Sequence, residues 1–508
     1  MRTRPLLLVA VTAGFFLLIA AFHLASAKAG YSHYRDQHLG TALEYAAGKI
    51  DLLRPVIVGF TATATPIPQE VPVWQALAGA VFKLLGPWFG WANLLSLGLF
   101  ATGLWPLFAL AKHYLGERGA WWTLIFFLAQ PITILVSGQA ATDGLSLVLA
   151  IWFLFCADRL VRTERLAWLA PSIIFGSLAA TAKLPLFMCM GLASFFLLLT
   201  NAPRSFRAWA LLASTGIASA AALFSWTHYT DGCLAQAEFA HVDLRVTYGG
   251  PMWIWYFGDW SYRLNPANWI KGGWAALNVL FGSFALAALA GWSLLFSKNR
   301  AGQAAMAAAF CTTLVFSHLV LVHRHYYVLY SVAVALLSAG AVLRMEEQWN
   351  LHKGWQQFVS IAGISGCLLL AGVQGLIGME IVLNYDPYPQ AVAERVRQHT
   401  APTDKLLIQG GGWGGNILIL SQRRGLTIDD TRMLEDPQKR ERLLELGYNK
   451  LVMISESPLL NALQQTNPGN FSRERLSYRA ALTPVAEPFK TIFESPDVLI
   501  TELPAISR

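Results

Sequence analysis

A series of long apolar runs constrains this chain more than any other feature of its sequence. A helix that crosses a bilayer needs about 20 mostly apolar residues, because it must span roughly 30 Å of hydrocarbon. The first run follows Met-Arg-Thr-Arg and is longer than the apolar core of a signal peptide, so we expect an uncleaved anchor. The sequence predicts about eleven spans, at residues 5–27, 88–111, 119–137, 144–157, 166–181, 184–199, 208–226, 272–296, 304–322, 326–343 and 358–383.

Composition and charge agree with a lipid environment. Charged residues make up 13% of the chain, against ~25% in an ordinary soluble domain. The net charge of +8 does not indicate nucleic-acid binding, because Lys and Arg lie in short tethers between apolar runs instead of forming a patch. The 5 cysteines are far apart, and all but Cys233 fall inside apolar runs, so neither a disulfide framework nor a CxxC metal site is expected.

The distribution of basic residues predicts the orientation of the chain. With the N-terminus in the cytoplasm, the opposite short connections carry only Lys183 and Arg324, as the positive-inside rule requires. We therefore expect a bacterial-type inner (plasma) membrane protein with a cytoplasmic N-terminus. Three large segments then lie outside, at residues 28–87, 228–271 and 384–508.

The first outer segment carries two apolar stripes at helical spacing, separated by the proline-containing residues 65–72. The stripes are Leu39, Leu43, Ala46, Ile50 and Leu53, then Val73, Leu77, Val81 and Leu84. Helices of this kind lie in the membrane interface. They favour an enzyme that works at the lipid surface. The second outer segment is rich in Trp and Tyr, which either anchor it at head-group level or form a lid.

After Asn384 the composition becomes that of a soluble domain, which divides the chain into a membrane part, 1–383, and a C-terminal part, 384–508. Predicted helices at 390–399, 415–422 and 437–446 alternate with predicted strands at 405–409, 426–428 and 450–454. This order is typical of a small parallel α/β sheet.

Gly410, Gly412 and Gly415 follow the first predicted strand in the spacing of a dinucleotide motif, with Asp429 and Asp430 downstream. Glycine-rich turns are common in such sheets, and NAD is scarce outside the cytoplasm. A docking or acceptor-recognition role is the favoured interpretation.

Ionisable residues gather at the predicted outer ends of the spans. Placing such groups at membrane depth costs free energy, so they are candidate site residues. They are Asp36, Asp143, Lys183, His323, Arg324 and His325, the last followed by Tyr326. Such groups can bind an anionic head group and deprotonate an acceptor. Each of them has a structural alternative. Asp36 can be a solvated loop carboxylate beside Arg35, and Asp143 can cap a helix. Lys183 and Arg324 can extend to the interface, and the histidines can be ordinary interface residues.

The ordered set of these motifs resembles the GT-C type of membrane glycosyltransferases. It comprises the first-loop Asp36, the interfacial helices with Val73-Trp74-Gln75-Ala76-Leu77, Thr142-Asp143, Lys183-Leu184-Pro185 and Arg324-His325-Tyr326-Tyr327. It is most similar to dolichyl-phosphate-mannose protein mannosyltransferases and bacterial lipid A aminoarabinose transferases. The resemblance covers residues 1–383 and implies an α-helical GT-C membrane fold.

The resemblance also implies transfer of a sugar from a polyprenyl-phosphate carrier to an extracytoplasmic acceptor. Asp36 would be the general base of an inverting displacement. Lys183 and Arg324 would bind the departing phosphate, His325 and Tyr326 would add hydrogen bonds, and Arg263 would reach the phosphate from the second outer segment.

The sequence leaves three alternatives, one for the role of Glu70 and two for the functional class. Glu70 stands in Gln69-Glu70-Val71-Pro72, where the aminoarabinose transferases have Glu-Lys-Pro-Pro, and with Asp143 it would bind the acceptor or a divalent cation. A transporter or flippase of lipid-linked sugars is the rival functional class. A non-catalytic scaffold is a third, but it leaves the outer Asp, Lys and Arg residues unexplained.

Overall fold

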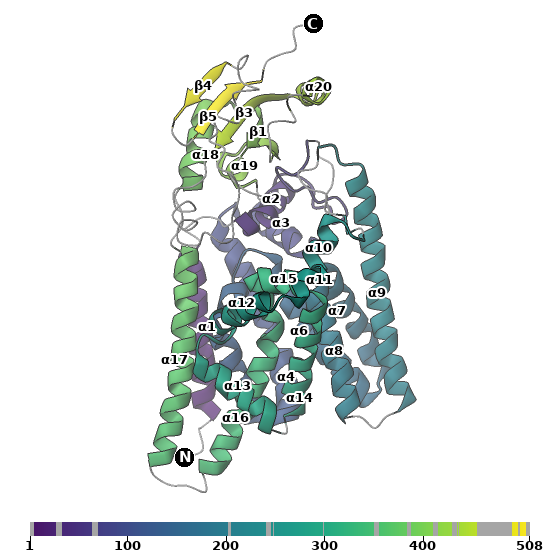
Figure 1. The fold of residues 1–508 in the computed structure, drawn as a ribbon, viewed down its shortest axis with the longest axis vertical. Coiled ribbons are helices and arrows are strands. Elements are labelled where there is room, and N and C mark those ends of the chain that lie inside the picture. The colour runs from purple at the N-terminus through teal and green to yellow at the C-terminus, as the bar shows by residue number, and fades with distance from the viewer. Residues whose placement is uncertain are drawn as a thin grey trace. The chain divides into compact units, whose positions relative to one another are not determined.

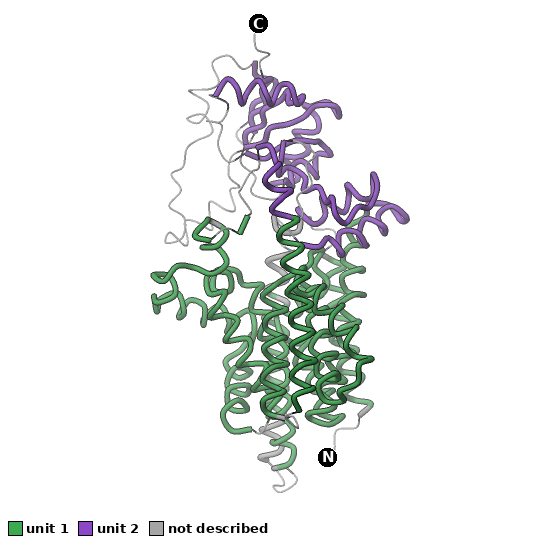
Figure 2. The backbone as a smooth tube through the Cα atoms, turned by 90° about the vertical axis from the view of Figure 1, so that its right-hand side faces the viewer, with its two compact units in different colours: residues 1–28, 88–229, 245–383 green, residues 29–87, 230–244, 384–508 purple. Residues whose placement is uncertain are grey.

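The computed structural model forms two compact units, which Figure 2 colours separately. Unit 1 contains residues 1–28, 88–229 and 245–383, and unit 2 contains residues 29–87, 230–244 and 384–508. The structure describes residues 5–26, 33–62, 70–201, 205–239, 245–246, 248–297, 299–349, 355–383, 388–409, 415–428, 434, 436–454, 490–495 and 498–503.

The described secondary-structure elements of unit 1 are all helices (Figure 1). Its α-helices are α1 (Pro5–Ser26), α4 (Phe89–Ala129), α5 (Pro131–Ser137), α6 (Thr142–Thr163), α7 (Leu169–Ala182), α8 (Leu184–Asn201), α9 (Phe206–Ala235), α10 (Pro251–Phe257), α11 (Trp260–Leu264), α12 (Pro266–Ala276), α13 (Phe284–Phe296), α14 (Arg300–Val315), α15 (Ser317–Val322), α16 (Ser331–Trp349) and α17 (Trp355–Leu383). Helix α9 continues into unit 2. Three short helices complete the set: η1 (Leu166–Trp168), η2 (Leu277–Phe281) and η3 (Arg324–Tyr330).

The core of unit 1 surrounds α6 and α16. Helix α6 packs against α4, α7 and α8, while α16 packs against α4, α13 and α14. Both are apolar on nearly every face and almost fully buried, as expected for helices at the centre of a bundle.

Every predicted span falls mainly on helix in the structure, with breaks at Gln130 in 119–137, at Phe316 in 304–322 and at residues 282–283 in 272–296. Among the described residues, 5 helices are long and apolar enough to cross a membrane alone, or 6 with one bent pair counted as a span. Shorter apolar helices, including α8 and the run formed by η1 and α7, account for much of the rest. The protein is thus an integral membrane protein, and the number of eleven crossings stays a prediction.

The predicted continuous helix at 272–296 is wrong. The segment Pro266–Phe281 meets Phe284–Phe296 at 98°. Gly282 has φ +67°, and a Cβ there would lie 2.7 Å from the Cα of Ala371 in α17. The Ser283 hydroxyl then accepts a hydrogen bond from the Leu286 N–H at 3.1 Å and caps α13. The bend therefore follows from a left-handed glycine pressed against α17 and a new helix cap.

Unit 2 contains a pair of packed helices, α2 (His33–Ala47) and α3 (Val73–Leu85). A Cβ on Gly79 of α3 would lie 2.6 Å from the Tyr45 Cβ, so the two helices meet at a glycine. The predicted stripe through Ile50 and Leu53 is wrong, because α2 ends at Ala47 and Leu53 is exposed in the following turn.

The predicted stripe on α3 forms the outward face of that helix. Leu77 is 39% exposed and Leu84 81% exposed. The buried apolar face of α3 consists of Trp74, Ala78 and Phe82. The predicted helix is confirmed, its predicted stripe is exposed, and its place in the membrane interface stays a prediction.

The C-terminal part of unit 2 is a sheet of 5 strands in the order β2-β1-β3-β5-β4. The strands are β1 (Lys405–Gln409), β2 (Arg424–Ile428), β3 (Tyr448–Ile454), β4 (Thr491–Glu494) and β5 (Val498–Glu502). Strand β1 pairs in parallel with β2 and β3, which confirms the predicted parallel core. Strands β4 and β5 form an antiparallel addition that the sequence did not predict.

Helices cover both faces of this sheet. Apolar side chains of α18 (Tyr388–His399) and α19 (Asn416–Ser421) bury one face, and those of α20 (Pro437–Glu445) bury the other. The alternation of Leu406, Leu407 and Ile408 between the two cores is the period of a strand buried on both sides. Residues 410, 412, 429 and 430 of the dinucleotide-like motif lie outside the described residues.

Candidate functional site

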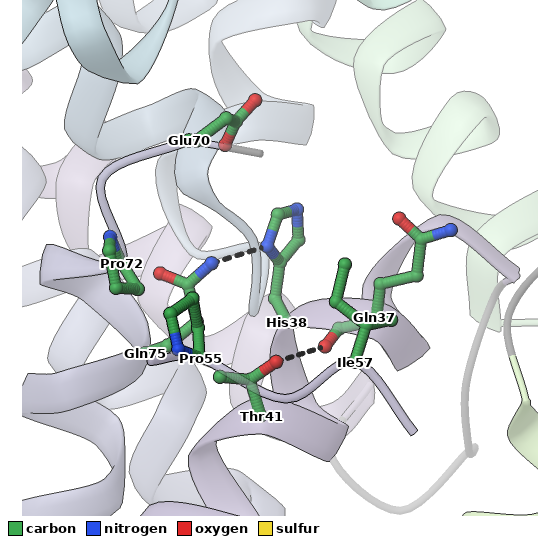
Figure 3. Close-up of a pocket in the computed structure, with 8 residues that line it drawn as sticks. All are labelled: Gln37, His38, Thr41, Pro55, Ile57, Glu70, Pro72 and Gln75. Carbon is green, nitrogen blue, oxygen red and sulfur yellow. Dashed lines mark hydrogen bonds between the residues drawn. The ribbon is translucent and has the colours of Figure 1, made fainter. Parts of the chain in front are cut away.

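A pocket in unit 2 lies against the N-terminal half of α2. It encloses about 310 Å³ of space, part of it open to solvent. Its lining comes from α2, from the loop after α2 and from the start of α3, as Figure 3 shows. The lining residues are Gln37, His38, Thr41, Pro55, Ile57, Glu70, Pro72 and Gln75. Three separate stretches of the first outer segment therefore build one polar hollow.

The centre of this pocket is a buried pair formed by His38 and Gln75. The Gln75 side-chain amide donates to His38 Nδ1 at 2.9 Å, and both residues are at most 7% exposed. Because Nδ1 accepts, the neutral imidazole carries its proton on Nε2. Trp74 packs edge-on against the ring, with 6.3 Å between centroids. The pair therefore holds His38 in one tautomer and one orientation.

Gln75 has unused hydrogen-bonding capacity. Its Oε1 atom is buried without a hydrogen-bond partner among the described residues. A buried acceptor without a donor costs about 1–3 kcal/mol. A ligand that brings a hydroxyl or amino group to this point would remove that cost.

The predicted base, Asp36, lies on α2 two residues before His38. Its side chain lies outside the described part of the chain. Glu70 is half-buried in the pocket lining, before the start of α3. The structure thus places Glu70 at the pocket and Asp36 on the helix that forms one of its walls.

A second polar cluster lies within unit 1, around Asp143 and Lys183. Asp143 is in the first turn of α6, and Lys183 ends α7. Lys183 Nζ lies 2.9 Å from Asp143 Oδ1, and both residues are at most 5% exposed. A Cβ on Gly144 would lie 2.5 Å from the Val136 carbonyl oxygen, so close packing on α5 fixes the start of α6. The two predicted site residues form one buried ion pair.

Aromatic and histidine rings extend this cluster. Lys183 Nζ lies 5.0 Å from the centroid of the Tyr326 ring, which is typical of a cation–π contact. Tyr326 also contacts the His325 ring, with 4.5 Å between centroids. Burial, followed by the charge of Lys183, lowers the pKa of His323, so this imidazole is neutral at pH 7. Arg324, between the two histidines, is exposed.

Arg263 makes structural contacts within unit 1. Its guanidinium donates to the Phe257 carbonyl at 2.8 Å and to the Val315 carbonyl at 3.2 Å. It also lies 5.5 Å from the centroid of the Trp260 ring. Arg263 therefore ties the aromatic segment at 251–264 to the end of α14, and its role toward a phosphate stays a prediction.

Among the described residues, no group of three or more His, Cys, Asp or Glu side chains is placed to hold a metal ion. Glu70 belongs to unit 2 and Asp143, which pairs with Lys183, belongs to unit 1. Sequence reasoning placed Gln75 inside a motif without giving it a role, and it did not single out Thr41. Neutral polar residues on a helix carry no sequence signal of a site until their partners are known.

These features define a polytopic membrane protein with a GT-C-type fold. The chain is similar to the crystal structure of ArnT from Cupriavidus metallidurans bound to undecaprenyl phosphate, with 14% identity, a TM-score of 0.62, and coverage of 99% of this chain and 98% of that chain. The same protein in the apo state gives 13% identity, a TM-score of 0.60 and 98% coverage of both chains. The sequence itself matches no family model and no curated protein. The resemblance predicted from short motifs is confirmed at the level of fold.

Proposed function

We propose that this protein transfers a hexosyl or pentosyl group from a polyprenyl-phosphate-linked donor to an extracytoplasmic glycan, lipid or protein. The observation that carries the proposal is the likeness of fold to ArnT, which extends over 99% of the chain. That protein was crystallised with undecaprenyl phosphate. The polar pocket on α2, beside the position of Asp36, supports the same proposal.

In the proposed reaction, an acceptor hydroxyl attacks the anomeric carbon while the bond from that carbon to the phosphate oxygen breaks. Asp36 accepts the hydroxyl proton, and polyprenyl phosphate leaves with inversion of configuration. His38, held in its Nε2–H form by Gln75, donates a hydrogen bond to a sugar or acceptor oxygen. No nucleotide sugar takes part.

The charge on the departing phosphate needs a cation. Lys183 is already paired with Asp143, and a buried pair of this kind has no net charge. Arg324 is exposed and follows His323 at the start of η3, so we assign it the main phosphate contact. Lys183, His325 and Tyr326 then hold the turn on which Arg324 lies.

The test is transfer, or slow hydrolysis, of a panel of radiolabelled polyprenyl-phosphate hexoses and pentoses by the purified full-length protein. Asp36→Asn is compared with Glu44→Gln, a residue about two turns further along α2 and outside the pocket lining. We expect one donor to react, a loss of about 100-fold or more for Asp36→Asn, and near wild-type rates for Glu44→Gln. Equal rates for the two variants would remove Asp36 from its role as base.

One observation favours a second candidate, a flippase of lipid-linked sugars. The 98° bend within an apolar helix pair is a broken span or a re-entrant segment, and such breaks are frequent in transporters. Proteoliposomes decide between the two. If every donor stays intact while a labelled lipid-linked sugar crosses the bilayer, the transferase proposal fails and the flippase takes its place.

A further inference from the structure

One wall of the pocket continues into the edge of the C-terminal sheet. Pro55 and Ile57 line the pocket, and the chain then runs to Gly59. Gly59 forms a parallel β-bridge with Leu426 of β2, and the Thr427 N–H donates to the Gly59 carbonyl at 2.8 Å. Because β2 is the edge strand of the sheet, the loop after α2 adds to that edge through this bridge.

At this junction the loop and the sheet domain approach each other closely at two glycines, one from each segment. Gly59 has φ +82°, and a Cβ there would lie 3.0 Å from both Leu418 Cδ1 and Thr427 Oγ1. Gly415, before α19, has φ +59°, and a Cβ there would lie 2.5 Å from the Val58 carbonyl oxygen. Only glycine meets both the backbone conformation and the space. Gly415 is the last glycine of the dinucleotide-like motif. The space beside it is thus filled by Val58, in the loop from the first outer segment.

Helix α2 itself also packs on this domain. A Cβ on Gly40 would lie 3.0 Å from Ile419 Cδ1 of α19 and 3.2 Å from Val58 Cγ2. Gly40 is two residues from His38 and four from Asp36 on the same helix. On the pocket side of α2, the Thr41 hydroxyl donates to the Val56 carbonyl at 2.9 Å. Helix, loop and α19 therefore form one packed layer.

A second attachment lies at the end of the loop. The buried Tyr448 hydroxyl of β3 donates to the Ala62 carbonyl at 2.9 Å. The Ala62 N–H donates to the Glu238 carbonyl at 3.2 Å, and the Glu238 carboxylate pairs with Arg442 of α20. The Glu238 to Arg442 pair is exposed and contributes little, whereas the buried Tyr448 bond fixes the loop directly.

We infer that the C-terminal α/β domain is a positioning element of the site, which holds α2 and the 55–59 wall of the pocket in place through Gly40, Gly59, Gly415 and Tyr448. The inference rests on the proposed function for its consequence in catalysis. It assigns the domain a structural task toward the pocket in place of an independent docking role.

The test uses the full-length protein and three variants. Gly59→Ala blocks the junction, and Tyr448→Phe removes one hydrogen bond with little change in shape. Gly447→Ala is the control, because Gly447 has φ +85° in the same domain but its Cβ would meet only the Lys405 side chain, at 3.8 Å. Hydrogen exchange is measured for residues 33–62 and for β1 and β3, together with KM and kcat for the reactive donor.

We expect exchange of residues 33–62 to rise about tenfold or more in Gly59→Ala, and less in Tyr448→Phe, while β1 and β3 stay protected. kcat/KM should fall about 10- to 100-fold in Gly59→Ala, because small misplacements of reacting groups have effects of that size. Gly447→Ala should change thermal stability without changing the exchange of residues 33–62 or the value of kcat/KM.

Unchanged exchange of residues 33–62 in both Gly59→Ala and Tyr448→Phe overturns the inference. Increased exchange with wild-type kinetics also overturns it, because α2 would then not need this support. If the wild-type protein transfers no donor, the proposed function fails, and exchange alone decides whether the domain holds α2.

Discussion

The pair formed by His38 and Gln75 is the residue-scale feature on which the pocket chemistry depends. Gln75→Glu replaces the amide donor by a carboxylate acceptor with little change in volume. We expect ¹⁵N spectra of histidine-labelled protein to show His38 protonated on Nε2 in the wild type and on Nδ1 in the variant. His38→Gln assigns the signal. A wild-type His38 protonated on Nδ1 would mean that the Gln75 oxygen, and not its nitrogen, faces the ring.

The Asp143–Lys183 ion pair offers a second residue-scale prediction. Lys183→Met leaves a buried carboxylate without its cation, which costs about 3–5 kcal/mol. The double variant Asp143→Asn/Lys183→Met should recover most of that loss, as measured by thermal unfolding in detergent. Sugar transfer by the purified double variant then distinguishes a structural role of the pair from a role in the site. Retained activity marks the pair as structural, and lost activity at restored stability marks it as part of the site.

His323 predicts a pH dependence of stability. Its folded-state pKa lies below the unfolded value, because burial and the Lys183 charge disfavour the imidazolium. The unfolded chain therefore binds a proton that the folded chain does not, and stability falls as pH falls through about 6.5. We expect His323→Gln to reduce the loss of melting temperature between about pH 7.5 and pH 5.5. The exposed His228→Gln is the control. An equal loss in wild type and His323→Gln would contradict the assignment.

At the scale of elements, a substitution at Gly282 tests whether the bend between η2 and α13 requires glycine. Gly282→Ala strains a left-handed backbone and forces a Cβ against Ala371 of α17, so we expect a loss of stability of about 1–3 kcal/mol. Gly291→Ala, on α13 with open space around it, should be neutral or stabilising by up to about 1 kcal/mol. Similar melting temperatures for the two variants would show that the bend does not need glycine.

The helices and the parallel strands were predictable because their signals are local. Runs of apolar residues locate helices, and alternating helices and strands indicate a parallel sheet. The packed face of α3 was not predictable, because Leu77 and Leu84 repeat at the same spacing as Trp74, Ala78 and Phe82. Its choice depends on the contact of Gly79 with Tyr45, which lies far away in sequence.

The same limit applies to the candidate site. Asp143 and Lys183 are charged residues in apolar surroundings, so the sequence marks them as exceptional. Gln75 and Thr41 are ordinary polar residues, and they become notable only through His38 and Val56. The attachment of residues 56–62 to the sheet joins segments more than 300 positions apart, and no periodicity reports such a contact.

At the scale of the whole molecule, the charge distribution predicts which side of the membrane each loop faces. The distribution of Lys and Arg predicts that the Gly116 turn, between Lys112 and Arg118, is cytoplasmic and that the C-terminal domain is outside. Glu117→Cys and Gln438→Cys test the two sides, because both positions are exposed. All 5 native cysteines are first replaced by alanine.

In intact spheroplasts, a membrane-impermeant maleimide should modify Gln438→Cys and leave Glu117→Cys unmodified, and inside-out vesicles should reverse the result. The physical reason is that arginine and lysine near the ends of spans are retained on the cytoplasmic side during insertion. Modification of both positions from one side would mean that an even number of crossings separates them. The α2 pocket would then face the cytoplasm or the count of spans would change, and an extracytoplasmic acceptor would no longer follow from the topology.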